Sequence, residues 1–583
     1  MRSFFKMFFA SFLAMAIFFI VAFFLLFALI GTVASKDKPD LPDKSVLVLN
    51  LGQHFRERLQ ENPLAVFSNK ETEIPGLYDV VRLLNHAKED DKVEGILVQA
   101  DQNNNGLAAS DELRNALLDF KASGKFIIAH GDVMSQGAYF VASAAHKVYI
   151  NPTGALDWSG FNVDLAFVKG TLDKMEIQPQ IFYAGKFKSA TEPFRTTEMT
   201  VENEMQTKDW LGDLYNYFLM RTSQVRKMDT ATLHALANSG AIQNASDALR
   251  HKLVDGVKYD DEIKDEIKGR LKIDKYDKMS LVSINTYAEA ANFRRSGSSR
   301  IAVIYAEGAI VDGKGSSETI GSDDFVKHVR KARLDKSIKA IVFRINSGGG
   351  SALASENIWR ELTLAKKEKP VVVSFGDVAA SGGYYIGAAA DSIFSNSNTI
   401  TGSIGVFGII PNMQGFFKNK LGVTFDGVKT ATYADAGVIY RPLNEAEKKI
   451  IQQSVDKIYL QFKQRVAQGR KKDINYIDSI AQGRVWSGED AMKIGLVDKI
   501  GGLQSAVDCA VRMAKLEDYR IREYPEKENW LNNLLGRTKS DPVVKIKEQL
   551  GDEYFRVYHQ MMQVKEMCGS IQTRLPFEFF ISK

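Results

Sequence analysis

The 583-residue sequence contains only two cysteines, Cys509 and Cys568. So few thiols exclude a scaffold built on disulfides and any cysteine-rich zinc or iron–sulfur site. The eight histidines are scattered along the chain, and no His-Glu-x-x-His or similar ligand spacing occurs among them. We therefore expect neither a catalytic metal nor any other cofactor.

An excess of one charge is also missing. The chain has 76 Lys and Arg against 71 Asp and Glu, which leaves a net charge of +5. Over this length the excess is too small to form a nucleic-acid-binding surface, so we expect neither DNA nor RNA as a partner. Hydrophobic residues make up 45% and charged residues 25% of the chain, as in folded proteins.

One long hydrophobic run is present at the N-terminus. Residues 7–35 contain no charged residue, and the run exceeds the roughly 20 residues that cross a bilayer. We expect a retained transmembrane anchor; a cleaved signal is the alternative, because residues 32–34 (Thr-Val-Ala) offer a cut site. Arg2 and Lys6 precede the run without an acid, which predicts that residues 1–6 are cytoplasmic and the body lies across the membrane.

The rest of the chain reads as a duplication with an offset of about 245 residues. The matching stretches follow one another in the same order in both copies: 95–100 with 340–345, 126–129 with 371–374, and 131–139 with 376–384. Short apolar runs alternate with helical patterns at 109–123 and 354–367, which indicates buried parallel strands joined by helices.

This alternation predicts the α/β class, as two tandem repeats with right-handed crossovers. We place the repeats at 45–293 and 301–525 and a polar linker at 294–300. Residues 526–583 have no counterpart in the first repeat and look helical at 530–535 and 543–567. Their apolar end could dock on the body, on another subunit or on the membrane.

The two repeats differ within two equivalent loops. Residues 346–351 read Asn-Ser-Gly-Gly-Gly-Ser where the first repeat has an Asn run, and Ser381 stands where the first repeat has Gln136. The N–H groups of Gly349 and Gly382 could together hold an oxyanion next to the Ser381 hydroxyl. The alternatives are a glycine-rich turn and a helix N-cap serine, both common in proteins.

A nucleophilic serine needs a base. The histidines of the second repeat and tail, His328 and His559, do not lie in a triad-like setting. A lysine can serve if burial lowers its pKa from about 10.4 by several units. Lys186 and Lys188 lie among aromatic and small residues at 182–190, although most lysines are simply solvated.

At three motifs the sequence resembles the long, tandem members of the signal peptide peptidase A (SppA) family. These members are membrane-anchored bacterial Ser/Lys proteases. Lys188 lies in the run Phe-Lys-Ser-Ala-Thr-Glu-Pro-Phe, and Ser381 in Ala-Ser-Gly-Gly-Tyr-Tyr. The resemblance implies that Lys188 is the general base and Ser381 the nucleophile. Residues 401–405 resemble the segment whose serine bonds the lysine, which makes Ser403 the orienting residue.

The resemblance covers about residues 45–525 and implies a crotonase-like fold, shared with Clp proteases, in each repeat. The family's oxyanion loop commonly reads Asn-Ser-Pro-Gly-Gly, whereas Gly348 here replaces the proline and leaves the Gly349 amide in place. The second repeat lacks the lysine motif near 428–433, and the first lacks the serine. We therefore predict one site that both repeats complete.

The function implied by the resemblance is that of a serine endopeptidase that degrades cleaved signal peptides in or near the membrane. It further implies peptide substrates, a ring-like homo-oligomer of four chains, and a single-pass protein of the bacterial inner membrane with a periplasmic body. Two alternatives remain: a catalytically silent, membrane-tethered scaffold that binds peptides, and acyl-CoA chemistry that uses the oxyanion hole without a Ser/Lys pair.

Overall fold

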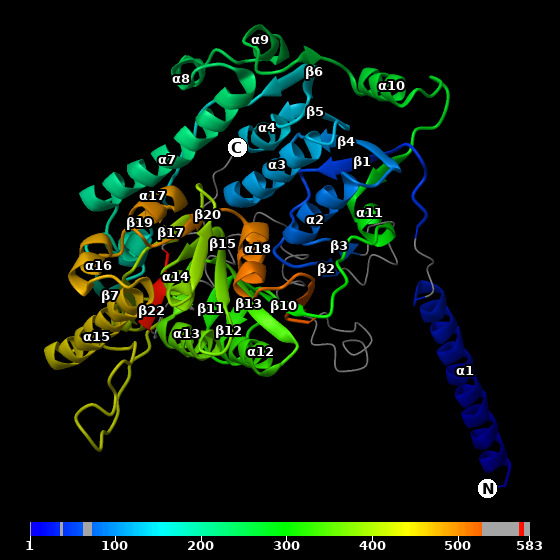
Figure 1. The fold of residues 1–583 in the computed structure, drawn as a ribbon. Helices are drawn as coiled ribbons and strands as arrows, with labels where there is room; N and C mark the ends of the chain where they lie inside the picture. Colours follow the sequence, from blue (N-terminus) through cyan, green and yellow to red (C-terminus); the bar gives the residue numbers. More distant parts are fainter. Residues whose placement is uncertain (1, 35–38, 62–72, 527–570, 576–583) are drawn as a thin grey trace.

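The computed structural model describes residues 2–34, 39–61, 73–526 and 571–575. Helix α1 (Arg2–Ala34) stands apart from the body (Figure 1). Among the described residues, none of the helices combines the length and the apolar character that crossing a membrane requires. The transmembrane anchor over residues 7–35 stays a prediction.

The first repeat is built on a six-stranded parallel sheet with the order β8-β6-β5-β4-β1-β9. Its strands are β1 (Ser45–Asn50), β4 (Val93–Gln99), β5 (Phe126–Met134), β6 (Lys147–Leu156), β8 (Gly256–Val257) and β9 (Leu281–Ser283). A small pair, β2 (Gln60–Glu61) and β3 (Glu73–Ile74), lies outside this sheet. The helices are α2 (Leu77–Ala87), α3 (Leu107–Lys121), α4 (Gln136–Ala142), α5 (Lys169–Lys174), α6 (Glu192–Arg195), α7 (Val201–Arg226), α8 (Thr230–Asn238), α9 (Ala245–Arg250), α10 (Asp260–Leu271) and α11 (Ile284–Ala290).

The second repeat has an eight-stranded sheet in which β19-β17-β15-β13-β10-β21 form the main order; off this order, β16 pairs with β15, and β20 pairs with β16. Its strands are β10 (Arg300–Glu307), β13 (Ile338–Ser347), β15 (Val371–Ala380), β16 (Ser392–Ser395), β17 (Ile400–Gly402), β19 (Val485–Ser487), β20 (Lys499–Ile500) and β21 (Arg520–Tyr524). The helices are α12 (Ser322–Leu334), α13 (Ala352–Lys366), α14 (Gly382–Gly387), α15 (Glu445–Arg470), α16 (Ile474–Ile480), α17 (Gly488–Lys493) and α18 (Leu503–Met513), with a short π-helix at Phe416–Lys420.

Equivalent hydrogen bonds recur in the two repeats. The Tyr139 hydroxyl donates to the Leu253 carbonyl at 2.7 Å, and the Tyr384 hydroxyl donates to the Leu496 carbonyl at 2.9 Å. Each repeat also has its own apolar core, because strands that are buried on both faces need helices on each side. The predicted tandem α/β architecture is confirmed at this level.

A third sheet joins the two repeats and the C-terminal segment, in the order β12-β11-β14-β22-β18-β7. Its strands are β7 (Gln178–Ala184), β11 (Ala309–Val311), β12 (Thr319–Gly321), β14 (Gly349–Ser351), β18 (Val406–Asn412) and β22 (Ile571–Arg574). Strand β7 comes from the first repeat and pairs antiparallel with β18 of the second over seven residue pairs. The helices predicted at 530–535 and 543–567 lie outside the described residues.

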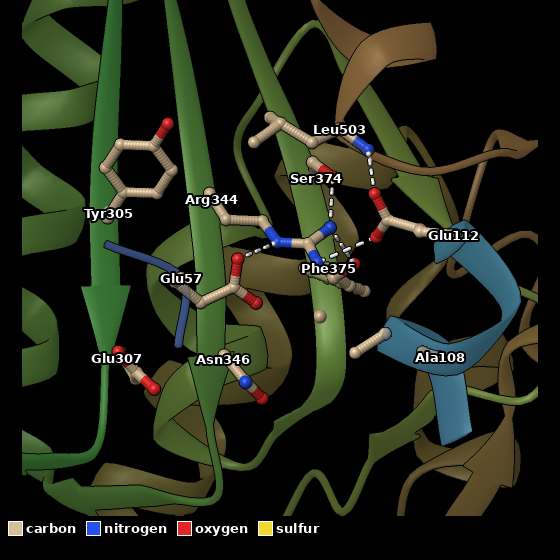
Figure 2. A network of polar contacts seen from close by, with 12 residues as sticks. Glu57, Ala108, Glu112, Tyr305, Glu307, Arg344, Asn346, Ser374, Phe375 and Leu503 are labelled. Atoms are coloured by element: carbon tan, nitrogen blue, oxygen red, sulfur yellow. Dashed lines mark hydrogen bonds and ion pairs between the residues drawn. The ribbon is translucent and has the colours of Figure 1, made fainter. Parts of the chain in front are cut away.

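A buried ion network holds the repeats together (Figure 2). Arg344 on β13 is fully buried; its guanidinium donates to Glu57 at 2.9 Å and to Glu112 at 2.8 Å, both from the first repeat. It also donates to the Ser374 hydroxyl and the Phe375 carbonyl. Burial raises the pKa of Glu57 to about 7. A charge buried this deeply is tolerated only with its partners, so the network favours the packed arrangement of the repeats.

Candidate active site

Ser381 occupies a tight turn between β15 and α14. Its backbone has φ 55° and ψ −115°, and a positive φ is uncommon for a residue with a Cβ. The Ser381 N–H donates to the Gly402 carbonyl at 2.8 Å, which ties the turn to β17. The side chain is fully buried. The turn thus fixes the hydroxyl at the carboxyl end of a central strand.

Lys188 reaches Ser381 from the other repeat. After β7 pairs with β18, the chain turns at Gly185 (φ 105°), and the Phe187 N–H donates to the Gln482 carbonyl at 2.8 Å. The Lys188 backbone then packs against Gly483, where a Cβ would lie only 2.7 Å from the Lys188 nitrogen. A glycine is needed at 483 for this close approach.

The Lys188 amine meets two hydroxyls. Its Nζ lies 3.0 Å from Ser381 Oγ, 3.0 Å from Ser403 Oγ and 3.4 Å from the Ser403 carbonyl oxygen. The lysine side chain is 1% exposed, and this burial lowers its pKa to about 7. Near neutral pH, a large fraction of the amine is therefore uncharged and able to accept a proton.

Ser403 also lies on a constrained turn. It follows β17 with φ 48°, and its N–H donates to the Arg484 carbonyl at 2.7 Å. The residue is 1% exposed. Because both its hydroxyl and its carbonyl face Lys188 Nζ, Ser403 can hold the amine in place beside Ser381.

The structure separates the two candidate lysines. Lys186 is exposed to solvent, whereas Lys188, two residues later, is buried. The backbone turns between the two residues, so their side chains differ in solvent exposure. Only Lys188 of the two contacts Ser381. Lys186 therefore offers a natural internal comparison for Lys188.

Gly349 and Gly382 lie side by side next to Ser381. Gly349 has φ 101°, and a Cβ there would lie 2.7 Å from the Gly382 nitrogen. The Gly349 N–H donates to Ser347 Oγ at 3.1 Å. The two predicted oxyanion residues are thus brought together, but the Gly349 amide must leave the Ser347 hydroxyl before it can bind an oxyanion.

Two buried polar residues to which the sequence analysis gave no role lie at the lysine segment. Gln206 on α7 donates to the Phe187 carbonyl at 3.1 Å and accepts from the Val485 N–H at 3.2 Å. Glu192, 1% exposed, accepts from Asn203 Nδ2 at 2.8 Å. Glu192 belongs to the motif that contains Lys188, which was a signal for it, whereas a glutamine such as Gln206 also occurs on solvated helix faces and carries no signal of its own.

The C-terminal strand β22 is the third feature that sequence reasoning missed. It pairs antiparallel with β14 on one side and β18 on the other. Thr573, fully buried, lies opposite Gly350, and a Cβ on Gly382 would lie 3.0 Å from the Thr573 carbonyl oxygen. A strand of four residues with distant partners leaves no periodic signal of its own.

The equivalent position in the first repeat is closed. The Gln136 amide donates to the Gly160 carbonyl at 2.9 Å, and its oxygen accepts the Gly160 N–H at 3.0 Å. The Gln136 side chain thereby holds the loop at Gly160 by two hydrogen bonds, and it has no hydroxyl that could act as a nucleophile. The arrangement at Ser381, with a buried amine, a hydroxyl and two adjacent glycine amides, is suited to acyl transfer.

Comparison with known proteins gives matches along both repeats. The model of peptidase family S49 matches residues 119–274 and 363–517. Protease 4 of Salmonella typhi is 35% identical over 491 residues, which are 82% of this chain and 76% of that protein. A provisionally named signal peptide peptidase SppA of Enterococcus faecium is 36% identical over 248 residues, 40% of this chain and 72% of that protein. The solved structure of a ClpP1 mutant from Listeria monocytogenes covers 35% of this chain and 94% of its own at 16% identity and a TM-score of 0.24, too weak a likeness to define the fold.

Proposed function

Because this chain belongs to peptidase family S49 and is a serine peptidase, we propose that Ser381 is its nucleophile and Lys188 its general base. The observation that carries the proposal is the 3.0 Å distance between Lys188 Nζ and Ser381 Oγ in a fully buried site. The lowered pKa of Lys188 supports it, since a general base works best when its pKa lies near the working pH.

The residues divide the reaction among them. Neutral Lys188 takes the proton of Ser381 as Oγ attacks the peptide carbonyl, and Ser403 keeps the amine oriented. The N–H groups of Gly382 and Gly349 stabilise the oxyanion, with Gly349 exchanging its bond to Ser347 for the developing charge. Protonated Lys188 then donates to the leaving amine, and water hydrolyses the acyl-enzyme by the reverse sequence.

The proposed substrates are cleaved signal peptides that remain in or near the membrane. The apolar run at 7–35 supports this, because a membrane-anchored peptidase stays close to an apolar peptide that does not diffuse far. The name of the Enterococcus faecium relative supports the same class. We place the chain in the bacterial inner membrane, with a cytoplasmic N-terminus and a periplasmic body.

We further propose that the protein works as a homo-oligomer of four chains. Apolar side chains are exposed on the segment after β18, where Leu421 is 56% and Val428 is 102% exposed. An exposed apolar segment of this kind is typical of protein contact surfaces. Co-expressed Ser381→Ala and Lys188→Ala chains test whether sites are shared between chains. Because the two residues meet within one chain, the mixture should stay inactive, and restored activity would mean that neighbouring chains complete one another's sites.

Peptide hydrolysis by single variants tests the dyad. Ser381→Ala and Lys188→Ala should each lower kcat/KM by about a thousandfold or more, because the two residues act as one unit. Lys186→Ala is the matched control and should keep the activity of the unchanged protein, since Lys186 is exposed. Substantial peptidase activity in Ser381→Ala would disprove the assignment, and thioester hydrolysis independent of Ser381 would favour acyl-CoA chemistry.

A further inference from the structure

The contact between the two repeats buries more negative charge than positive charge (Figure 2). Arg344 of β13 is fully buried, and Glu57 and Glu112 of the first repeat are 4% and 7% exposed. The guanidinium contacts both carboxyls. When both carboxyls are ionised, this buried group carries one negative charge too many. An uncompensated buried charge is unfavourable, so one of the two carboxyls is expected to bind a proton more readily than it does in water.

Glu57 is the carboxyl with fewer hydrogen bonds. Glu112 accepts three, one of them from Arg344 at 2.8 Å. The other two come from Asn396 Nδ2 and from the Leu503 N–H, each at 3.1 Å. Within the described part of the chain, Glu57 accepts a hydrogen bond from Arg344 Nε alone, at 2.9 Å. Hydrogen bonds to a carboxylate favour its ionised form, so the proton is expected on Glu57.

The charged groups that face Glu57 act in both directions. Burial has the largest effect, and together with the like charges of Glu112 on α3 and Glu307 at the end of β10 it raises the pKa of Glu57 to about 7. Arg344 lowers the pKa but does not offset the burial. Arg56, the residue before Glu57, donates to Glu307 at 3.3 Å.

Two further titratable groups near this cluster have other hydrogen-bond partners. Asp377 on β15 accepts the N–H groups of residues 108 and 109 at the start of α3, at 2.8 and 3.0 Å. Tyr305 on β10 donates its hydroxyl to Glu523 at 3.1 Å. Neither bonds Glu57, so the compensation of an ionised Glu57 depends on Arg344.

Glu57 lies where β13 and β15 lead toward the active site. Its Oε1 is so close to β15 that a Cβ on Gly376 would lie 2.7 Å from it, and the same Cβ would lie 2.9 Å from Asn346 of β13. β13 continues into the loop that carries Gly349, and β15 ends next to Ser381. A charge that appears on Glu57 therefore acts on both strands at once.

We propose that Glu57 binds a proton when the repeats are packed, and that loss of this proton at rising pH weakens the contact between them. The usual pKa of the carboxyl is 4.5 and that of folded Glu57 is about 7, so the folded protein binds more protons between these values. The stability that this proton provides is fully present below about pH 4.5 and is lost as the pH rises through about 7. Lys188 becomes uncharged in the same range, so the base becomes active while the contact between the repeats weakens.

Urea denaturation of the full-length protein and of Glu57→Gln, from pH 5 to pH 8, tests the effect on stability. Glutamine resembles the protonated carboxyl but cannot ionise, and Lys188 titrates equally in both proteins. The unfolding constant of the unchanged protein, divided by that of Glu57→Gln, should rise about fiftyfold over this range. Glu318→Gln is the control, because this carboxyl is 56% exposed, and its ratio should stay constant. A constant ratio for Glu57→Gln as well would overturn the proposal.

Infrared spectroscopy detects the proton itself, because a protonated carboxyl and a carboxylate absorb at different frequencies. A protonated-carboxyl band that disappears with a midpoint near pH 7 should occur in the unchanged protein and in Glu318→Gln, and should be missing from Glu57→Gln. If Glu57→Gln does not fold, Glu307→Gln replaces it, and removal of this like charge should move the midpoint to lower pH. A band that is missing from the unchanged protein, or that these variants leave as it was, would overturn the proposal. Neither measurement involves Ser381, so both outcomes are independent of the proposed peptidase chemistry.

Discussion

At the scale of single residues, the chemistry depends on what burial does to one lysine. Lys188 has the same covalent structure as Lys186, yet its pKa falls to about 7 because its amine is removed from water. Its contacts at 3.0 Å are hydroxyls, which can hold a neutral amine without restoring its charge. The protein thereby obtains a base for neutral pH without a histidine.

This burial should cost stability, which Lys188→Met tests. The unfolded lysine is protonated up to about pH 10, whereas the folded one loses its proton near pH 7, so the unfolded chain binds more protons between these values. The free energy of unfolding of the unchanged protein should thus rise with pH across this window. Lys188→Met should be inactive but more stable at pH 7, by about 2–4 kcal/mol, with the gain shrinking toward pH 10.

Urea denaturation at pH 7 and pH 10 measures this difference. Lys186→Met is the control, and its effect should stay within about 0.5 kcal/mol because the side chain is exposed. A Lys188→Met protein that is less stable than the unchanged one at pH 7 would mean that the amine is held charged.

At the scale of elements, the site depends on how helix α7 is hydrogen-bonded to the segment that contains Lys188. Gln206 bonds the Phe187 carbonyl on one side and the Val485 N–H on the other, so it couples the segment to β19. Gln206→Ala should lower kcat about tenfold with little change in KM, because a misplaced base slows the chemical step.

Steady-state kinetics with a peptide substrate, measured against pH, checks this expectation. Gln224→Ala is the control, since Gln224 lies on the same helix and is exposed. If Gln206 positions Lys188, its loss should also shift the midpoint of the pH profile. A raised KM with unchanged kcat and an unchanged profile would instead indicate a role in substrate binding.

Some of these structural elements could be predicted from the sequence, and others could not. The duplication could be predicted from the residues, because apolar runs are local signals. The pairing of Ser381 with Lys188 was implied only by the family resemblance, since composition alone did not separate Lys188 from Lys186. Strand β22 could not be predicted, since its four residues acquire strand structure only from partners more than 160 residues away. The bond from the Gly349 N–H to Ser347 was equally hidden, because it depends on a φ of 101° that no composition dictates.

At the scale of the whole molecule, activity requires that the repeats remain packed. Arg344 joins two carboxylates of the first repeat to the strand that leads into the Gly349 loop. The three charged residues lie far apart in the sequence and within ordinary stretches, so nothing but the fold reveals the network. The Arg344 network thus keeps the two repeats, which supply Lys188 and Ser381, packed together, although it is not part of the active site.

Removal of this guanidinium should therefore weaken the whole protein. Arg344→Met leaves Glu57 and Glu112 buried without their partner, which should cost about 3–5 kcal/mol in the free energy of unfolding. Arg330→Met, which removes a half-exposed partner of Glu361, should cost no more than about 1 kcal/mol. Denaturant unfolding compares the two, and equal costs would argue against a special role for the network.

The most direct test of the account is the pH dependence of Ser381 labelling by a fluorophosphonate in the unchanged protein and in Lys188→Ala. A base with a pKa of about 7 predicts that the rate rises through neutral pH and levels off above it, and that Lys188→Ala removes this rise and labels far more slowly. The same rate and the same pH profile in both proteins would show that Lys188 does not activate Ser381.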